Sequence, residues 1–325
     1  VLPDRGRDVL VKRFGLGPDS KKMTLESIGN IYGITRERVR QLENFALDSV
    51  RKSDAFTDAQ SNFEELENLV SSLGGVVGED YLLNHISKDV SVQNNTTILL
   101  VLGNSFSRER ENNDFKHRWI VDKDIANKVH EALGAFHKSL SKDDIISEND
   151  VIVSFLEYLD DESEQYKNEE IVKQWLSLSK TIGKNPLGEW GMANSPNINA
   201  RGMRDYAFLV IRRHGSPMHF TEVAGNITDV FGKKAHIATC HNELIKDSRF
   251  VLVGRGLYAL SDWGYEGGVV KDVIKKMLKK SGPLTKEEIV EKVLKERYVK
   301  ENTVMVNLQD NRHFKKDNSG RYRAS

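Results

Sequence analysis

The stretch from Met23 to Glu43 restricts the fold of this chain more than any other segment. Its first part, residues 23–34, reads as a helix that stops at Gly33, a residue type that commonly ends helices. Thr35 follows, and its hydroxyl can accept a hydrogen bond from a backbone N–H at the start of a second helix. Helix, glycine turn and capped second helix together predict a helix-turn-helix.

The second helix of this pattern has one apolar and one polar face. At 3.6 residues per turn, an inward face collects Val39, Leu42, Ala46 and Val50. Arginine side chains fit guanine edges and phosphates, glutamine fits adenine, and a carboxylate can accept from cytosine. A solvated polar face is the alternative, but the preceding helix, the turn and the cap favour DNA recognition in the major groove. The predicted DNA-binding residues are Thr35, Arg36, Glu37, Arg38, Arg40, Gln41 and Asn44.

The same segment resembles a known family. Residues 2–17, 23–29 and 34–43 are closely similar to region 4 of primary-type bacterial sigma factors, which binds the promoter −35 element and the flap of RNA polymerase. The resemblance implies that Arg36, Glu37 and Gln41 read −35 bases. It also implies that Arg38 and Arg40 contact the DNA backbone or polymerase. Beyond residue 52 the chain departs from that family, without a segment for the −10 element. Since Val1 lies almost inside the motif, we expect residues upstream of it.

Composition sets the class of protein. The chain has 325 residues, of which 30% are charged and 38% hydrophobic, so several domains are expected. No apolar run approaches the roughly 18 residues of a membrane span, and no signal peptide is apparent. The single cysteine, Cys240, excludes an intrachain disulfide and fits a reducing compartment. We therefore expect a cytoplasmic, nucleoid-associated protein with no membrane partner.

The net charge of zero hides an uneven distribution. Residues 1–53 carry a net charge of +4, residues 265–325 carry +6, and the centre is consequently −10. The two basic ends are predicted to contact phosphates. The densest acidic stretch, residues 143–170, is either a solvated helical surface or a docking face for a basic protein.

A unit of roughly 60 residues repeats along the chain. The clearest copy has helices at 204–213, 220–231 and 235–247, followed by a hairpin that turns at 254–256, which predicts a winged helix. The fold class is therefore mainly α: a helix-turn-helix head followed by tandem winged-helix units with short β-hairpin wings. Residues 124–192 contain three predicted helices but no convincing hairpin, and 191–199 is the best linker. The predicted domains are a head at 1–53, a winged helix at 63–122, a helical unit and possible winged helix at 123–192, and winged helices at 200–265 and 266–325.

A second resemblance appears in the clearest copy. Residues 220–224, 241–247, 249–256 and 258–260 are similar to the HARE-type winged helix. That module also forms the folded part of the RNA polymerase delta subunit of some bacteria and occurs in chromatin and restriction proteins. Residues 266–325 resemble it less strongly. The resemblance implies a DNA-associated or polymerase-associated module.

The third helix of this copy leaves two functions open. Its predicted inward face is Ile237, Cys240, His241, Leu244 and Ile245. Its outward face has one charge, so both direct DNA reading and protein docking stay open. Arg255 lies in the hairpin turn, where it would meet a minor groove or a phosphate, or remain a surface residue. The candidate DNA contacts in this copy are Thr239, Asn242, Lys246 and Arg255.

No pattern for catalysis, metal or cofactor binding is found. The Gly254–Gly256 turn lies between two apolar strands and lacks the helix of a nucleotide-binding loop. His241 and Cys240 are not spaced as zinc ligands. We expect a non-enzymatic transcription protein that binds double-stranded promoter DNA at a −35-like element, docks on the flap of bacterial core RNA polymerase, or does both. The alternatives are a polymerase-binding adaptor and the specificity subunit of a DNA-modifying system.

Overall fold

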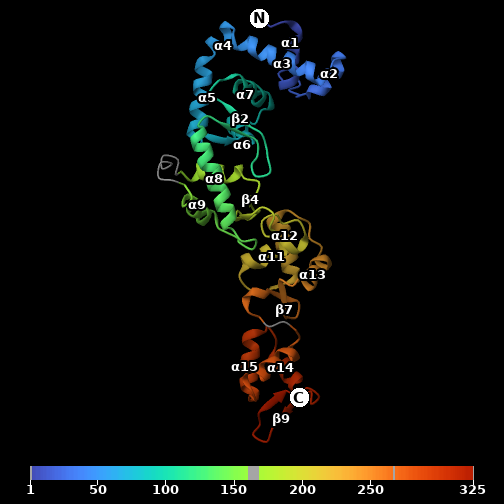
Figure 1. The fold of residues 1–325 in the computed structure, drawn as a ribbon. Helices are drawn as coiled ribbons and strands as arrows, with labels where there is room; N and C mark the ends of the chain where they lie inside the picture. Colours follow the sequence, from blue (N-terminus) through green and yellow to red (C-terminus); the bar gives the residue numbers. More distant parts are fainter. Residues whose placement is uncertain (1, 160–167, 266–267, 325) are drawn as a thin grey trace. The chain divides into compact units, whose positions relative to one another are not determined.

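The computed structural model describes residues 2–159, 168–265 and 268–324. The chain divides into two compact units, Val1–Asn194 and Ser195–Ser325, and the division falls inside the predicted linker at 191–199. Helices dominate both units, and small antiparallel sheets accompany them (Figure 1). The predicted fold class is therefore confirmed. Residues 160–167 of the acidic stretch lie outside the described residues.

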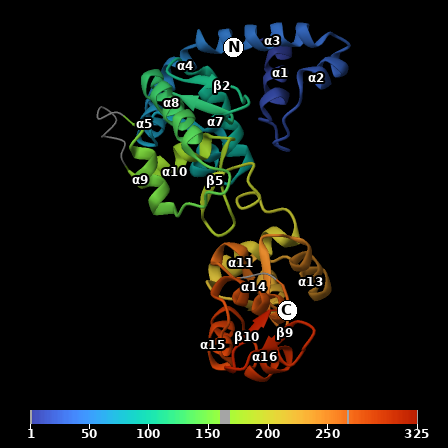
Figure 2. The ribbon, with the colours of Figure 1, turned by 60° about the horizontal axis from the view of Figure 1, so that its bottom comes forward.

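The first unit begins with three helices that form the head: α1 (Asp4–Phe14), α2 (Leu25–Tyr32) and α3 (Arg36–Arg51). One apolar residue from each helix, Val9, Ile28 and Val39, is fully buried in a small shared core. Figure 2 shows α1 and α2 on the same side of the long helix α3. A short helix, α4 (Asp54–Asp58), leads out of the head.

The next segment has winged-helix topology. Its elements are α5 (Gln60–Ser72), β1 (Val76–Gly78), α6 (Glu79–Ile86), α7 (Val90–Leu102), β2 (Ser107–Glu109) and β3 (Arg118–Ile120). Both strand pairs are antiparallel and the sheet order is β1-β3-β2. Val77 lies opposite Trp119, and both side chains are buried against α5 and α7.

The segment after it repeats the topology with a smaller sheet. Its elements are α8 (Lys123–Ser139), α9 (Glu148–Leu156), α10 (Glu169–Leu178), β4 (Ile182–Lys184) and β5 (Trp190–Met192). Ile146 forms a single bridge to Trp190 in place of a first strand. The hairpin that the sequence did not reveal is therefore present. Its strands have three residues each and pair Gly183 with Gly191, so they lack the β-branched alternation that marks a strand.

These two winged helices share one core. Val76 on β1 and Ile120 on β3 pack into the same buried cluster as Trp175 on α10. The side chain of Gln174 donates to the Val76 carbonyl at 2.8 Å, and the Trp175 indole donates to the Gly74 carbonyl at 3.2 Å. Residues 60–194 are thus held together by packing on both sides of the β1–β3 sheet.

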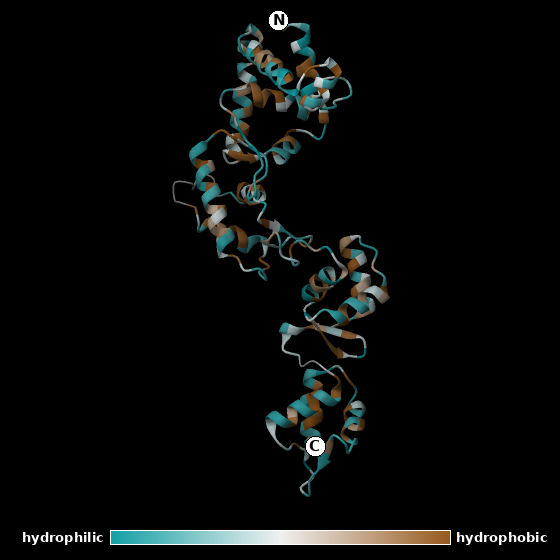
Figure 3. Ribbon diagram, turned by 45° about the vertical axis from the view of Figure 1, so that its right-hand side comes forward, coloured by the Kyte–Doolittle hydropathy of each residue, from teal (hydrophilic) through white to brown (hydrophobic). Residues whose placement is uncertain are grey.

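The second unit contains two further winged helices. The first has α11 (Met203–His214), β6 (Met218–His219), α12 (Phe220–Phe231), α13 (Ile237–Lys246), β7 (Phe250–Gly254) and β8 (Leu257–Leu260), with the order β6-β8-β7, and ends in the short helix η2 (Ser261–Trp263). The second has α14 (Val270–Ser281), α15 (Lys286–Glu296), α16 (Glu301–Leu308), β9 (Phe314–Lys316) and β10 (Tyr322–Ala324). Hydrophobic and hydrophilic residues alternate along these helices (Figure 3), as expected where one side of each helix is buried.

The two winged helices of this unit are joined at strand β7. The Tyr298 N–H donates to the Val253 carbonyl at 2.9 Å, which continues the sheet by one bridge. The buried Arg297 guanidinium donates to the carbonyls of Leu252 and Gly268. The outer edge of β7 is therefore covered by the chain that follows α15.

None of the helices in the described ranges is both long and apolar enough to cross a membrane.

Candidate nucleic-acid interface

The turn between α2 and α3 depends on glycine. The Ile34 N–H donates to the Gly29 carbonyl at 3.0 Å, which brings the two chain segments together. A Cβ atom at position 29 would lie 2.6 Å from the Ile34 carbonyl oxygen, so only glycine fits there. Gly33 ends α2 in the left-handed conformation, with φ of 63°. The predicted helix-turn-helix is therefore present, with its turn at the predicted residues.

Thr35 caps α3, as the sequence indicates. Its hydroxyl accepts a hydrogen bond from the Arg38 N–H at 3.2 Å. With this start, Val39 and Ala46 face inward with no exposed surface, and Leu42 is partly buried. The seven predicted contact residues are all exposed: Thr35, Arg36, Glu37, Arg38, Arg40, Gln41 and Asn44.

Two pairs of side chains organise the outer face of α3. Arg40 donates two hydrogen bonds to the Glu37 carboxylate, at 2.9 and 2.7 Å. This contact with Arg40 holds the pKa of Glu37 below its usual range, so the carboxylate stays ionised. Arg38 donates to the Gln41 side-chain oxygen at 2.9 Å. Exposed pairs of this kind contribute about 0.3–0.5 kcal/mol each, so base edges or phosphates can replace them at little cost.

The sequence analysis did not identify the residues that hold the head in place. Asn94 on α7 is buried, and its amide donates to the carbonyls of Gly15 and Ser20, at 3.0 and 2.9 Å. Arg51 at the end of α3 donates to the carbonyls of Val101 and Leu102, at 2.7 and 3.2 Å. Apolar residues of α1 and α3 share a core with residues of α5 and α7: Leu10, Phe14, Ala46, Leu47, Phe63 and Leu102. The head is therefore fixed to the winged helix that follows it.

Helix α13 presents a different outer face from the one predicted. Thr239, Asn242 and Lys246 are exposed, as expected. Ile237 and Ile245, however, were predicted to be buried and are 51% and 62% exposed. The correction has a geometric reason. Only the i, i+4 stripe of Cys240 and Leu244 meets the small core, and neighbouring positions turn about 100° away from it.

The remaining residues predicted to face inward are covered. His241 is partly buried and stacks on Phe220, with ring centroids 4.1 Å apart. Cys240 is fully buried, and this burial raises the pKa of its thiol to about 11. Arg255 is exposed in the turn between β7 and β8. Within the described ranges, no group of three or more His, Cys, Asp or Glu side chains could hold a metal ion.

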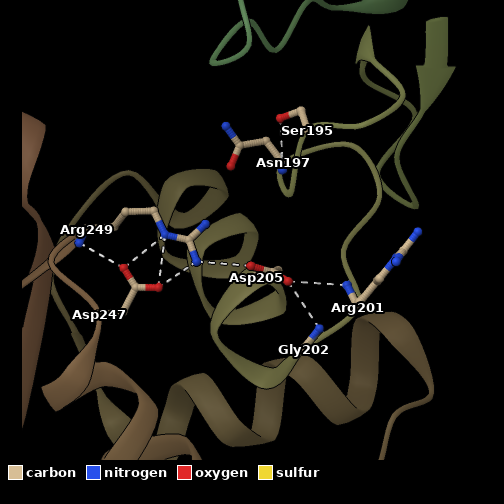
Figure 4. A network of polar contacts seen from close by, with 7 residues as sticks. All are labelled: Ser195, Asn197, Arg201, Gly202, Asp205, Asp247 and Arg249. Atoms are coloured by element: carbon tan, nitrogen blue, oxygen red, sulfur yellow. Dashed lines mark hydrogen bonds and ion pairs between the residues drawn. The ribbon is translucent and has the colours of Figure 1, made fainter. Parts of the chain in front are cut away.

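A polar network fixes the end of α13 (Figure 4). The Arg249 guanidinium donates to Asp247 at 2.7 Å and to Asp205 at 3.0 Å. Asp205 also accepts from the N–H groups of Gly202 and Arg201, at the start of α11. The hydrogen bond from Arg249 holds the pKa of Asp247 below its usual value of 3.8. These groups satisfy one another, which indicates a structural role.

Comparisons with known proteins support the two helix-turn-helix regions. Residues 1–52 match the family model for Sigma-70, region 4. Residues 201–263 match the HARE-HTH model, which describes a helix-turn-helix domain of ASXL and restriction endonuclease proteins. RNA polymerase sigma factor SigA of Listeria monocytogenes is 50% identical over 51 residues, which are 16% of this chain and 13% of SigA. SigA of Listeria innocua gives the same values.

The chain spans 13% of the length of these sigma factors. The matches confirm the resemblances to sigma factor region 4 and to the HARE-type helix-turn-helix, and together they support a transcription-related, DNA-binding role for this chain.

Proposed function

We propose that the head reads a −35-like promoter element through the outer face of α3, and that the protein acts by binding, without catalysis. Arg36, Glu37, Gln41 and Asn44 would contact base edges, while Thr35, Arg38 and Arg40 would contact the backbone or the polymerase. The supporting observation is that all seven side chains are exposed on one helix of a helix-turn-helix similar to sigma region 4. This activity belongs in the cytoplasm, at the nucleoid.

The fixed position of the head supports this function. Because Asn94 and Arg51 bond the head to α7, the outer face of α3 has a defined orientation on the first unit. Pre-organisation of this kind lowers the entropy lost when a surface binds its partner.

The first winged helix of the second unit would extend the contact. Thr239, Asn242 and Lys246 on α13, together with Arg255 in the wing, are exposed polar groups that suit phosphates more than base edges. A single basic residue within α13 limits what this helix adds to affinity.

A second candidate is an adaptor that docks on the flap of RNA polymerase core. The exposure of Ile237 and Ile245 beside Lys246 favours it, because isoleucine side chains gain more from a protein surface than from a phosphate backbone. The two functions are compatible, since the head and α13 belong to different units.

The first test measures discrimination between promoter and random duplexes. We expect Arg36→Ala, Glu37→Ala and Gln41→Ala each to reduce it by about 1–3 kcal/mol, because each removes a base contact. Glu26→Ala, at an exposed site on α2, is the control and should change nothing. Equal losses on both duplexes would exclude base reading by α3.

The second test concerns polymerase. Deleting residues 1–53 would uncover Phe63 and Leu102, so point substitutions are preferable to truncation. Capture of purified core polymerase should weaken in the double variant Ile237→Ser, Ile245→Ser if α13 is a docking surface. The α3 variants should then retain capture, unless the head also binds the flap.

A further inference from the structure

A groove of about 270 Å³ lies between the first two helices of the last winged helix. Val273 and Met277 on α14 line it with apolar surface; Val273 is buried and Met277 is partly buried. Four exposed lysines line it as well, two on each helix: Lys276, Lys280, Lys292 and Lys295. The α14 residues recur at intervals of three and four, which places them on one face of the helix.

The groove is strongly basic. Its four lysines are opposed by one acidic lining residue, Glu296. Lys295 is paired with Glu291 at 2.7 Å, but both side chains are exposed, so an incoming carboxylate can replace this contact at little cost. In the part of the chain that the structure describes, Lys280 and Lys292 form no ion pair. Their charge is therefore available to a partner.

The position of these lysines argues against a duplex-reading surface. In helix-turn-helix proteins, the third helix of the fold enters the major groove. Here that helix is α16, whose only charged residue is Glu301 and whose exposed surface includes Val306. The basic surface lies instead on α14 and α15, around an apolar floor that a phosphate backbone would not use.

The size of the groove points to side chains of a peptide. Its volume lies below the roughly 300–1,000 Å³ of small-molecule pockets, so it accommodates one or two side chains. Met277 provides a floor that adapts to the shape of an apolar side chain. Lysine is a flexible point charge that pairs readily with carboxylates at the rim.

We propose that the α14–α15 groove binds an acidic peptide segment of a partner protein. An apolar side chain of the peptide enters between α14 and α15 above Val273 and Met277, and flanking carboxylates pair with Lys280 and Lys292. This inference goes beyond the proposed function, which does not involve the last winged helix.

The experiment measures binding of the full chain to a short fluorescent peptide in which glutamates flank a leucine–phenylalanine pair. Anisotropy should report saturable binding, and Lys280→Glu should weaken it about tenfold by placing like charges together. Lys279→Glu is the matched control, because Lys279 is exposed on the same helix but does not line the groove. It should change the affinity by less than about twofold. A peptide with serines in place of the apolar pair should bind at least about tenfold more weakly, because it buries no apolar side chain.

Three outcomes would overturn the proposal. Equal weakening by Lys279→Glu and Lys280→Glu would show that general positive charge, and not the groove, attracts the peptide. Unchanged affinity of the serine peptide would show that the apolar floor is not used. A labelled duplex that loses affinity on Lys280→Glu substitution, with no binding of the acidic peptide, would assign the groove to nucleic acid. Circular dichroism of each variant separates these results from loss of folding.

Discussion

Helices α3 and α13 occupy the same place in two helix-turn-helix folds, but their outer faces differ. The exposed side of α3 carries Arg36, Arg38 and Arg40, whereas that of α13 carries Lys246 and two exposed isoleucines. Both helices bury a narrow apolar stripe against two neighbouring helices. The comparison shows that the fold fixes which positions face outward and does not fix what those positions bind.

The two helices are also supported differently. The head, with α3, is held by main-chain hydrogen bonds from Asn94 and Arg51, which join it to the next winged helix. The end of α13 is held by Arg249 and two aspartates within its own winged helix. The position of α3 therefore depends on a neighbouring domain, and that of α13 does not.

The largest expected effect tests the rotation of α13. Leu244 is 1% exposed, so Leu244→Asp should cost about 3–5 kcal/mol of unfolding free energy by burying an unpaired charge. Ile245→Asp, at the next residue, should change it by less than about 0.5 kcal/mol because Ile245 is 62% exposed. Thermal unfolding of the full chain, with amide exchange of α11–α13, measures both. The reverse order would mean that α13 is rotated.

The next effect tests the support of α3. Asn94→Ala leaves two buried carbonyls without their donor and should cost about 1–3 kcal/mol of stability in the first unit. Asn95→Ala on the exposed side of α7 is the matched control. Denaturant unfolding of both variants measures the difference. If the two variants are equally stable, the head is held by its apolar contacts alone.

A smaller effect compares the two outer faces on DNA. Arg38→Ala and Lys246→Ala should each reduce the slope of log affinity against log salt by about 1, because each removes one phosphate contact. Binding of a promoter duplex at several salt concentrations gives the slopes. A reduced slope for Arg38→Ala with an unchanged slope for Lys246→Ala would assign the outer face of α13 to protein contact.

The smallest effect concerns pH at the end of α13. The pKa of Asp247 is lowered in the folded protein, so its pair with Arg249 stabilises above the unfolded pKa and is lost as the pH falls through the folded value. Asp247→Asn should therefore cost up to about 1 kcal/mol at neutral pH, and this difference should vanish well below about pH 4. Asp229→Asn, exposed on α12, is the control. A difference that persists in acid would mean that the carboxylate charge is not responsible.

The sequence predicted most of the fold because local signals carry it. Gly33 and Thr35 mark the turn and cap of the head, and the apolar alternation in 250–260 marks a hairpin. It could not predict the exposure of Ile237 and Ile245, since periodicity shows which residues are apolar and not how wide a face the core covers.

Long-range polar contacts were also beyond the sequence. Asn94 and Asn95 are adjacent and identical, and only the position of the 15–20 loop distinguishes the buried one from the exposed one. The lysine groove requires two helices to be placed side by side, and a net charge summed over the segment does not show it.

The contacts made by Asn94 and Arg51 have an evolutionary consequence. Both side chains donate only to main-chain carbonyls of the opposite partner, at Gly15, Ser20 and the end of α7. A carbonyl is present whatever side chain a residue carries. Ser20, Val101 and Leu102 can therefore mutate without erasing the acceptors that attach the head. The promoter-facing surface of α3 can thus diverge between related proteins while its attachment to the first unit persists.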